Sequence, residues 1–311
     1  MHRRLAALRC LPAPTSSRVI VHWAAAVIVA GCAHGSASTQ PAADTTSTAP
    51  PALSALPLGD GKVSTAPRAG YVYSCQTSFG GNGGATGKAP WIVGTSWDQT
   101  AKPTVQGSVL WPNSRVTITV QAAERVVSAN NLPSHATGVF PIARGDPAYQ
   151  YDANPNSIAE QVILFRLVAQ PQAAALPTCV GQGMIGFTVS GAALYNALDA
   201  GGRDAAAHEV QDACGGHPQG AGQYHYHSWS NCFADAAGTQ GRHSDLVGYA
   251  LDGYGVYGEY GEGGVMLTNA QLDACHGHTH AVLWDGQQST IYHYHMTREY
   301  PYSVGCFHGV R

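Results

Sequence analysis

Charged side chains are scarce in this chain. Lys, Arg, Asp and Glu together make up 11% of the 311 residues, and the formal net charge is −3. Proteins that bind nucleic acids usually present a strongly basic face, so this composition argues against a nucleic-acid partner. Long helices are also disfavoured, because 37 glycines introduce turns and close backbone approaches along the chain. The composition predicts a turn-rich globular protein that is long enough to bury a real core.

Histidine is the residue type that is unusually frequent. The chain has 15 histidines, almost as many as its 16 Lys and Arg residues together. No nucleophile–base pair and no paired-carboxylate motif stands out beside them. Any chemistry of this protein is therefore expected to depend on imidazole groups.

The first 31 residues are predicted to be a signal peptide. Arginines precede the apolar run VIVHWAAAVIVA, which ends at small residues and is too short to span a membrane comfortably. The tetrapeptide that ends at Cys32 resembles a bacterial lipobox, which predicts lipidation of Cys32 and an exported, membrane-anchored lipoprotein facing the periplasm or the exterior. In the alternative interpretation, the signal is an ordinary secretory one and Cys32 is incidental.

The rest of the chain is predicted to be one tethered domain. Residues 32–69 contain mostly Ala, Ser, Thr and Pro, which cannot bury apolar surface, so we expect a lipid attachment site followed by a disordered linker. Residues 70–311 are expected to form a single domain. Its parts are a β-rich segment (70–184), a first repeat (185–246) and a second repeat (247–311).

Two segments of the β-rich part carry clear patterns. The run RVTITVQ at residues 115–121 alternates strictly and is followed by RVVS after a short turn, which predicts a hairpin. Residues 157–168, SIAEQVILFRLV, fit either a helix that begins at a capping box or a buried strand.

From residue 185 onward the sequence repeats itself. IGFTVSGAALYN aligns with VGYALDGYGVYG, QDACGGH aligns with LDACHGH, and each copy then has a Tyr-His-Tyr-His segment followed by a cysteine. Each copy is expected to contain a strand, a short helix capped by Asp204 or Asn269, and a strand that carries the tetrapeptide. We expect the two copies to pack face to face about a pseudo-twofold axis. The predicted fold class is mainly β with a few short helices (α+β), as two pseudo-symmetric, disulfide-stapled repeats.

These segments resemble the YHYH-domain family. The resemblance runs from about Asn154 to Gly309 and includes NPNSI, ALYNALDAGGRDA, EVQDACGGHPQGAGQYHYHS, LDACHGHTH and YHYHMTREYPYSVGCFHG. Ser190 departs from it, because asparagine is expected before the glycine of this turn. The resemblance implies a fold and a bacterial envelope setting, and it implies little chemistry.

Six cysteines remain after Cys10 and Cys32 are set aside, and an even number in an exported protein predicts disulfides. Because each copy has one cysteine before and one after its Tyr-His-Tyr-His segment, we predict the pairs Cys214–Cys232, Cys275–Cys306 and Cys75–Cys179. The competing interpretation makes some of these cysteines thiolate ligands of a metal.

The paired histidines are the candidate metal ligands. Positions i and i+2 of a strand share a face, so the two histidines of each tetrapeptide project together, and a histidine after the preceding glycine can supply a third ligand. The predicted ligands are His217, His225, His227, His278, His293 and His295. His276 and His280 are further options in the second copy, and His243 is less persuasive. Asp212 and Asp273 are expected to accept the free ring N–H of a ligand.

Three functions are compatible with these patterns. The first is a lipid-tethered envelope protein that binds copper or zinc, since neutral imidazoles suit both metals. The second is a metalloenzyme that uses a three-His site. The third is a disulfide-stapled surface interaction domain in which histidines and tyrosines only hydrogen-bond one another. The sequence also leaves open whether the copies form one shared site or two separate sites.

Overall fold

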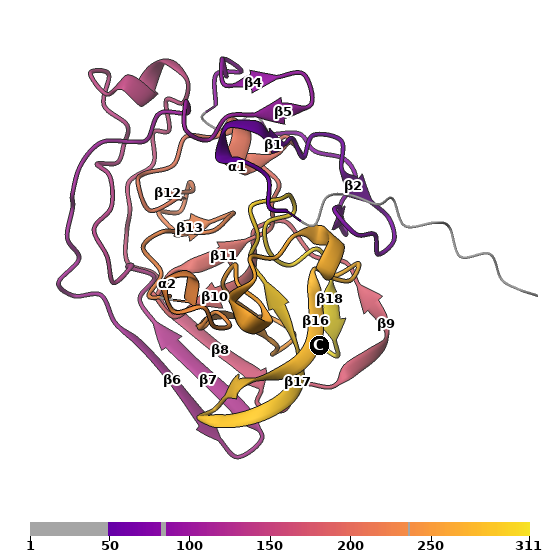
Figure 1. The fold of residues 1–311 in the computed structure, drawn as a ribbon. Coiled ribbons are helices and arrows are strands. Elements are labelled where there is room, and N and C mark those ends of the chain that lie inside the picture. Colours follow the sequence, from indigo (N-terminus) through magenta and orange to yellow (C-terminus); the bar gives the residue numbers. More distant parts are fainter. Residues whose placement is uncertain (1–48, 82–84, 236) are drawn as a thin grey trace, which may run out of the picture. The chain divides into compact units, whose positions relative to one another are not determined.

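The structure is a computed structural model that describes residues 49–81, 85–235 and 237–311. The signal peptide and Cys32 lie outside these residues. Both Tyr-His-Tyr-His segments belong to one eight-stranded sheet (Figure 1). Its strands, in spatial order, are β12 (Gly216–Pro218), β13 (Tyr224–Tyr226), β11 (Ala193–Tyr195), β10 (Met184–Thr188), β14 (Leu246–Ala250), β15 (Gly255–Tyr257), β17 (Gln287–His295) and β16 (Gly277–Trp284).

The two halves of this sheet have the same arrangement of strands. The central strands β10 and β14 are antiparallel, and Phe187 lies opposite Tyr249. These two residues also align with each other in the sequence repeat, so each central residue faces its own counterpart. On both sides, an antiparallel pair is followed by a parallel pair and then by another antiparallel pair. The repeats therefore lie edge to edge, and the expectation that they pack face to face is wrong.

A three-stranded sheet covers the middle of the large sheet. It consists of β6 (Val116–Gln121), β7 (Glu124–Ala129) and β8 (Ile163–Val168). The predicted hairpin is therefore confirmed, and within the undecided run at 157–168 only Ile163–Val168 form a strand. Burial of Val127 and Leu167 against Phe187 and Tyr249 holds the two sheets together.

The remaining elements are short. Three small sheets contain β1 (Leu56–Pro57), β5 (Ser96–Trp97) and β4 (Ile92–Val93); β2 (Val63–Ser64) and β3 (Val72–Tyr73); and β9 (Ala173–Thr178) and β18 (Phe307–Gly309). The helices are η1 (Leu53–Ala55), η2 (Pro147–Gln150), α1 (Ala205–His208), α2 (Ala237–Gln240), η3 (Glu262–Gly264) and η4 (Asn269–Gln271).

The helices expected in the two copies are shorter than the sequence suggested. Asp204 caps α1 as predicted, because its side chain accepts a hydrogen bond from the Ala207 N–H. Thr268, rather than Asn269, caps η4, with Gln271 completing a capping box.

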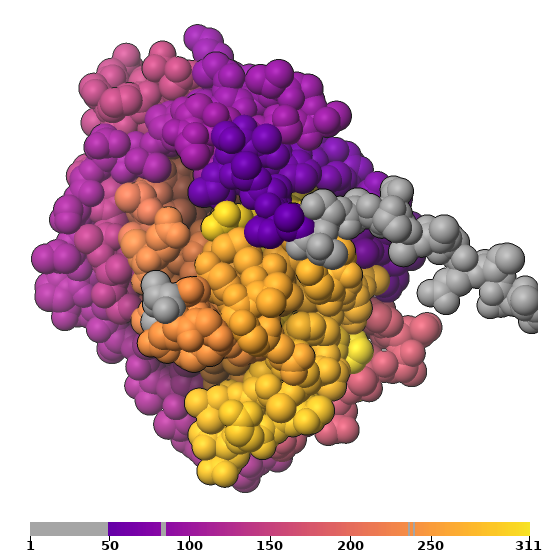
Figure 2. Space-filling model, viewed as in Figure 1, coloured from indigo at the N-terminus to yellow at the C-terminus, as the bar shows by residue number. Residues whose placement is uncertain are grey.

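The ordered fold begins before Gly70. Leu56 is buried in the main core, and the Gly59 N–H donates a 2.8 Å hydrogen bond to the Asp204 carboxylate. Tyr302, near the end of the chain, donates to the same carboxylate at 2.7 Å. Figure 2 shows this indigo segment lying against the yellow C-terminal segment. The prediction of a disordered linker up to residue 69 is therefore wrong for this stretch, because its few apolar residues are buried by distant parts of the chain.

Three disulfides staple the fold. They join Cys214 to Cys232, Cys275 to Cys306 and Cys75 to Cys179, which are the three predicted pairs. The observed fold class is mainly β, as expected. In the part of the chain that the structure describes, no helix has both the length and the apolar character needed to cross a bilayer.

Candidate metal centres

The first histidine cluster is assembled by the register of two strands. His217 in β12 lies directly opposite His225 in β13, and residues opposite each other in an antiparallel pair project from the same face. His227 follows two positions after His225 and projects from that face as well. Potential ligand nitrogens of these three histidines lie within 4.8 Å of one another, and all three side chains are buried.

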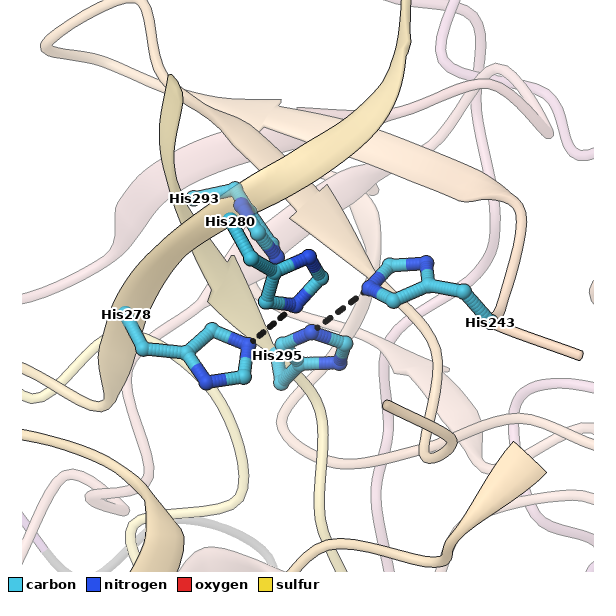
Figure 3. Close-up of side chains that lie close together, drawn as sticks. All are labelled: His243, His278, His280, His293 and His295. Carbon is cyan, nitrogen blue, oxygen red and sulfur yellow. Dashed lines mark hydrogen bonds between the residues drawn. The ribbon is translucent and has the colours of Figure 1, made fainter. Parts of the chain in front are cut away.

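The second cluster repeats this arrangement and adds two histidines. His278 in β16 lies opposite His293 in β17, and His295 follows two positions later. His280 and His243 complete a group of five whose potential ligand atoms also lie within 4.8 Å of one another. Figure 3 shows the five rings pointing toward a common centre, with His243 reaching in from the right, across from the strands that carry the other four.

The tyrosines of the two tetrapeptides take the opposite face of the sheet. They lie in the main hydrophobic core, and glycine at the start of β12 and β16 makes room for them. A Cβ atom at Gly216 would lie 2.3 Å from the Tyr224 ring, and one at Gly277 would lie 2.4 Å from the Tyr292 hydroxyl. The Tyr-His-Tyr-His pattern thus separates a packing face, formed by Tyr224, Tyr226, Tyr292 and Tyr294, from a histidine face.

Backbone carbonyls orient the rings of the first cluster. The Nδ1 atom of His225 lies 3.1 Å from the Gln223 carbonyl oxygen, and that of His227 lies 2.5 Å from the Asn196 carbonyl oxygen. A carbonyl oxygen only accepts, so each Nδ1 atom carries the proton and each Nε2 atom carries a lone pair. These two Nε2 atoms are 3.1 Å apart. Two neutral rings in this tautomer have no proton to share between them.

The second cluster contains the same arrangement. The Nδ1 atom of His295 lies 2.6 Å from the Gly258 carbonyl oxygen, and that of His243 lies 2.8 Å from the Ser244 carbonyl oxygen. Their Nε2 atoms are 3.2 Å apart, and both carry lone pairs by the same argument. Facing lone pairs repel unless a cation lies between them, so the geometry of each cluster can hold a metal ion.

The rings are held in their neutral form. Burial lowers the pKa of His227 to about 4 and that of His293 to about 3. Burial, followed by the neighbouring imidazoles His225 and His227, lowers the pKa of His217 well below its usual value. Neutral imidazole is the form that coordinates metals.

Some polar atoms in the clusters are buried without a partner. Within the described residues, four buried atoms of the clusters have no hydrogen-bond partner. They are both ring nitrogens of His217, the Nε2 atom of His293 and the Oε2 atom of Glu209. Burying such atoms without a partner costs free energy, so they point to a ligand. The Glu209 Oε2 atom lies 3.5 Å from the Nε2 atoms of both His217 and His227.

Asp212 and Asp273 do not contact the histidines as expected. The Tyr224 hydroxyl donates to Asp212 at 3.0 Å, and the Tyr292 hydroxyl donates to Asp273 at 3.0 Å. Each carboxylate also accepts backbone N–H groups of the tight turn before its strand. The prediction placed them beside the histidines, but the alternation of the strand puts them with the tyrosines. The backbone carbonyls take over the role of orienting the imidazoles.

Two other groupings are not metal sites. Cys214 and Cys232 lie near His135, but their sulfur atoms are bonded to each other and are not available as thiolates. The Nε2 atom of His135 instead lies 2.6 Å from the Tyr226 hydroxyl. His276 hydrogen-bonds the Ser303 carbonyl and the Thr297 hydroxyl, so this option for a ligand is wrong.

Sequence reasoning missed one cluster residue and left another as an option. His280 lies two positions after His278 in β16, so alternation alone places both on one face. His243 comes from the segment before β14, and no local pattern connects it to the strands that it meets. Gln219 occupies the position of the first half that corresponds to His280, so the first cluster lacks that ligand.

Comparison with known proteins gives one family. A family model described as "YHYH protein" matches residues 164–266, which include the first cluster and the central strands of the large sheet. No curated protein and no solved structure matches the chain. The matched segment ends before β16 and β17, whose pairing and histidines repeat those of β12 and β13. Residues 164–266 of the chain therefore carry a YHYH domain.

Proposed function

We propose that this protein binds two transition-metal ions per chain, one at each histidine cluster. The observation that carries the proposal is the pair of facing Nε2 atoms in each cluster, 3.1 Å apart between His225 and His227 and 3.2 Å apart between His243 and His295. Backbone carbonyls hold the Nδ1 protons on the far side of these rings. A shared cation converts this repulsive contact into coordination. Imidazole-rich sites suit copper and zinc.

The two sites are separate in this proposal. Strands β13 and β17 are five strand spacings apart in the large sheet, or roughly 24 Å at about 4.8 Å per spacing. No imidazole can bridge that distance. The apolar residues Phe187 and Tyr249 of the central strands, packed against Val127 and Leu167, lie between the two clusters. A single shared ion is therefore disfavoured.

Metal analysis of the purified protein tests this function. Protein isolated from an oxidising compartment and dialysed at neutral pH should retain about two ions of zinc or copper per chain. Removing them with a chelator should lower the unfolding temperature, because ions that bind only the folded state stabilise it. A chain without bound metal, whose unfolding temperature a chelator does not change, would instead support a structural role for the histidines.

We further propose that the protein is exported and tethered to a membrane through a lipid on Cys32. The three disulfides and the YHYH domain support export. In this proposal, Cys32→Ser should release the protein from the membrane fraction or leave its signal uncleaved. If the variant and the parent both stay in the aqueous phase of a detergent partition, Cys32 carries no lipid.

A further inference from the structure

The two clusters differ in a way that assigns them different ligand sets. This inference rests on the proposed function. We propose that Glu209 is a fourth ligand, through its carboxylate, of the metal ion at His217, His225 and His227. The same ion keeps one coordination position open to the adjoining cavity, where a small anionic ligand binds. The ion at the second site is bound by imidazoles and has no carboxylate ligand in this proposal.

The position of Glu209 follows from the short helix before it. Helix α1 ends at His208, and the Glu209 N–H still bonds to the Ala205 carbonyl oxygen. This directs the side chain toward β12, where its Oε2 atom lies 3.5 Å from the Nε2 atoms of both His217 and His227. Ligand atoms about 2.1 Å from one ion are about 3.0 to 3.4 Å apart at angles of about 90° to 109°, so the spacing fits donors of one ion that can take a fifth ligand.

The second half does not offer this carboxylate. Alignment of QDACGGH with LDACHGH places Ala270 at the position of Glu209. The nearby acid, Glu262, lies 3.8 Å from the Nδ1 atom of His280, and 72% of its side chain is exposed. The donor sets therefore differ: three imidazoles and a buried carboxylate in the first half, and imidazoles in the second. Carboxylate ligands shift a site toward harder divalent ions.

A cavity gives small molecules access to the first site. It has a volume of about 290 Å³, and its wall contains Glu209 and all three histidines of the cluster together with polar side chains. The Tyr195 ring stacks on His225 with ring centroids 3.9 Å apart, which fixes that imidazole at the cavity wall. The volume equals that of roughly ten waters at about 30 Å³ each, so it accommodates a small anion.

Cobalt(II) and azide test this inference on the full chain. The double substitution His293→Ala with His295→Ala removes two ligands of the second cluster, including one of its two facing Nε2 atoms, so that the first site can be observed alone. In this background, azide should change the visible absorption spectrum of bound Co²⁺, because it enters the open position. Introducing Glu209→Gln should weaken Co²⁺ binding by about tenfold or more. Glu262→Gln is the matched control and should leave the affinity unchanged.

The outcomes separate this inference from the proposed function. If Co²⁺ binds and azide leaves its spectrum unchanged, the open position is refuted. This azide experiment is made with Glu209 intact, so its result does not depend on the Glu209→Gln variant. If Glu209→Gln folds and binds Co²⁺ as tightly as the parent, Glu209 is not a ligand. If neither the wild type nor the background variant binds any metal, the proposed function itself fails.

Discussion

Replacing His293 and His295 together by alanine is expected to remove one of the two metal ions and to leave the other bound. The substitution deletes two of the five imidazoles around the second centre, including the Nε2 atom that faces His243 at 3.2 Å. The first cluster is roughly 24 Å away across the sheet and keeps its ligands. Metal content per chain, measured after dialysis, should fall from about two to about one.

A matched pair of variants makes this result specific. His225→Ala with His227→Ala should remove the other ion, whereas His208→Ala should remove neither, because His208 pairs with Asp60 outside both clusters. Loss of both ions in the His293 and His295 variant would indicate one shared centre. Unchanged metal content in this variant would show that these histidines are not ligands.

Bound metal is expected to resist acid well below the usual pKa of histidine. A free imidazole has a pKa near 6.5, so exposed ligands would begin to release their ion just below that pH. Burial lowers the pKa of His278 and of His227 to about 4, so protons compete with the metal only in more acidic solution. Dialysis at a series of pH values should show retention at pH 6 and release only near or below about pH 4. Release between pH 7 and pH 6 would contradict this account.

The same pKa shifts determine whether the metal-free protein becomes more or less stable as the pH falls. His227 has a lower pKa in the folded state than in the unfolded state, so its contribution to stability is present above about pH 6.5 and is lost as the pH falls toward 4. A shift from 6.5 to about 4 corresponds to about 3 kcal/mol at this one buried residue. The free energy of unfolding of chelated protein should therefore decrease with acidification over this range. A constant value from pH 7 to pH 4 would show that the rings already titrate freely.

Local alternation made much of the histidine face predictable. The i and i+2 spacing of His225 with His227 places both rings on one side of a strand, and the glycine before His217 marks the start of the neighbouring strand. The disulfide pairs followed from the repeat as well, because each half carries one cysteine on either side of its tetrapeptide. These features depend on short-range pattern and on symmetry.

Features that depend on long-range contacts were not predictable. His243 joins the second cluster from a segment with no pattern of its own, and Glu209 reaches the first cluster because α1 ends one residue earlier. Asp212 seemed suited to orient an imidazole, but the strand alternation places it beside Tyr224. The edge-to-edge packing also depends on the register between Phe187 and Tyr249, which no local pattern specifies.

Anomalous diffraction from crystals grown with zinc or copper is the most direct test of the central claim. Data collected at the absorption edge of the metal should give two strong peaks per chain. We predict one peak among His217, His225, His227 and Glu209, and one among His243, His278, His280, His293 and His295. A map with no peak at either cluster, from protein that is folded and fully loaded with metal salt, would contradict the account.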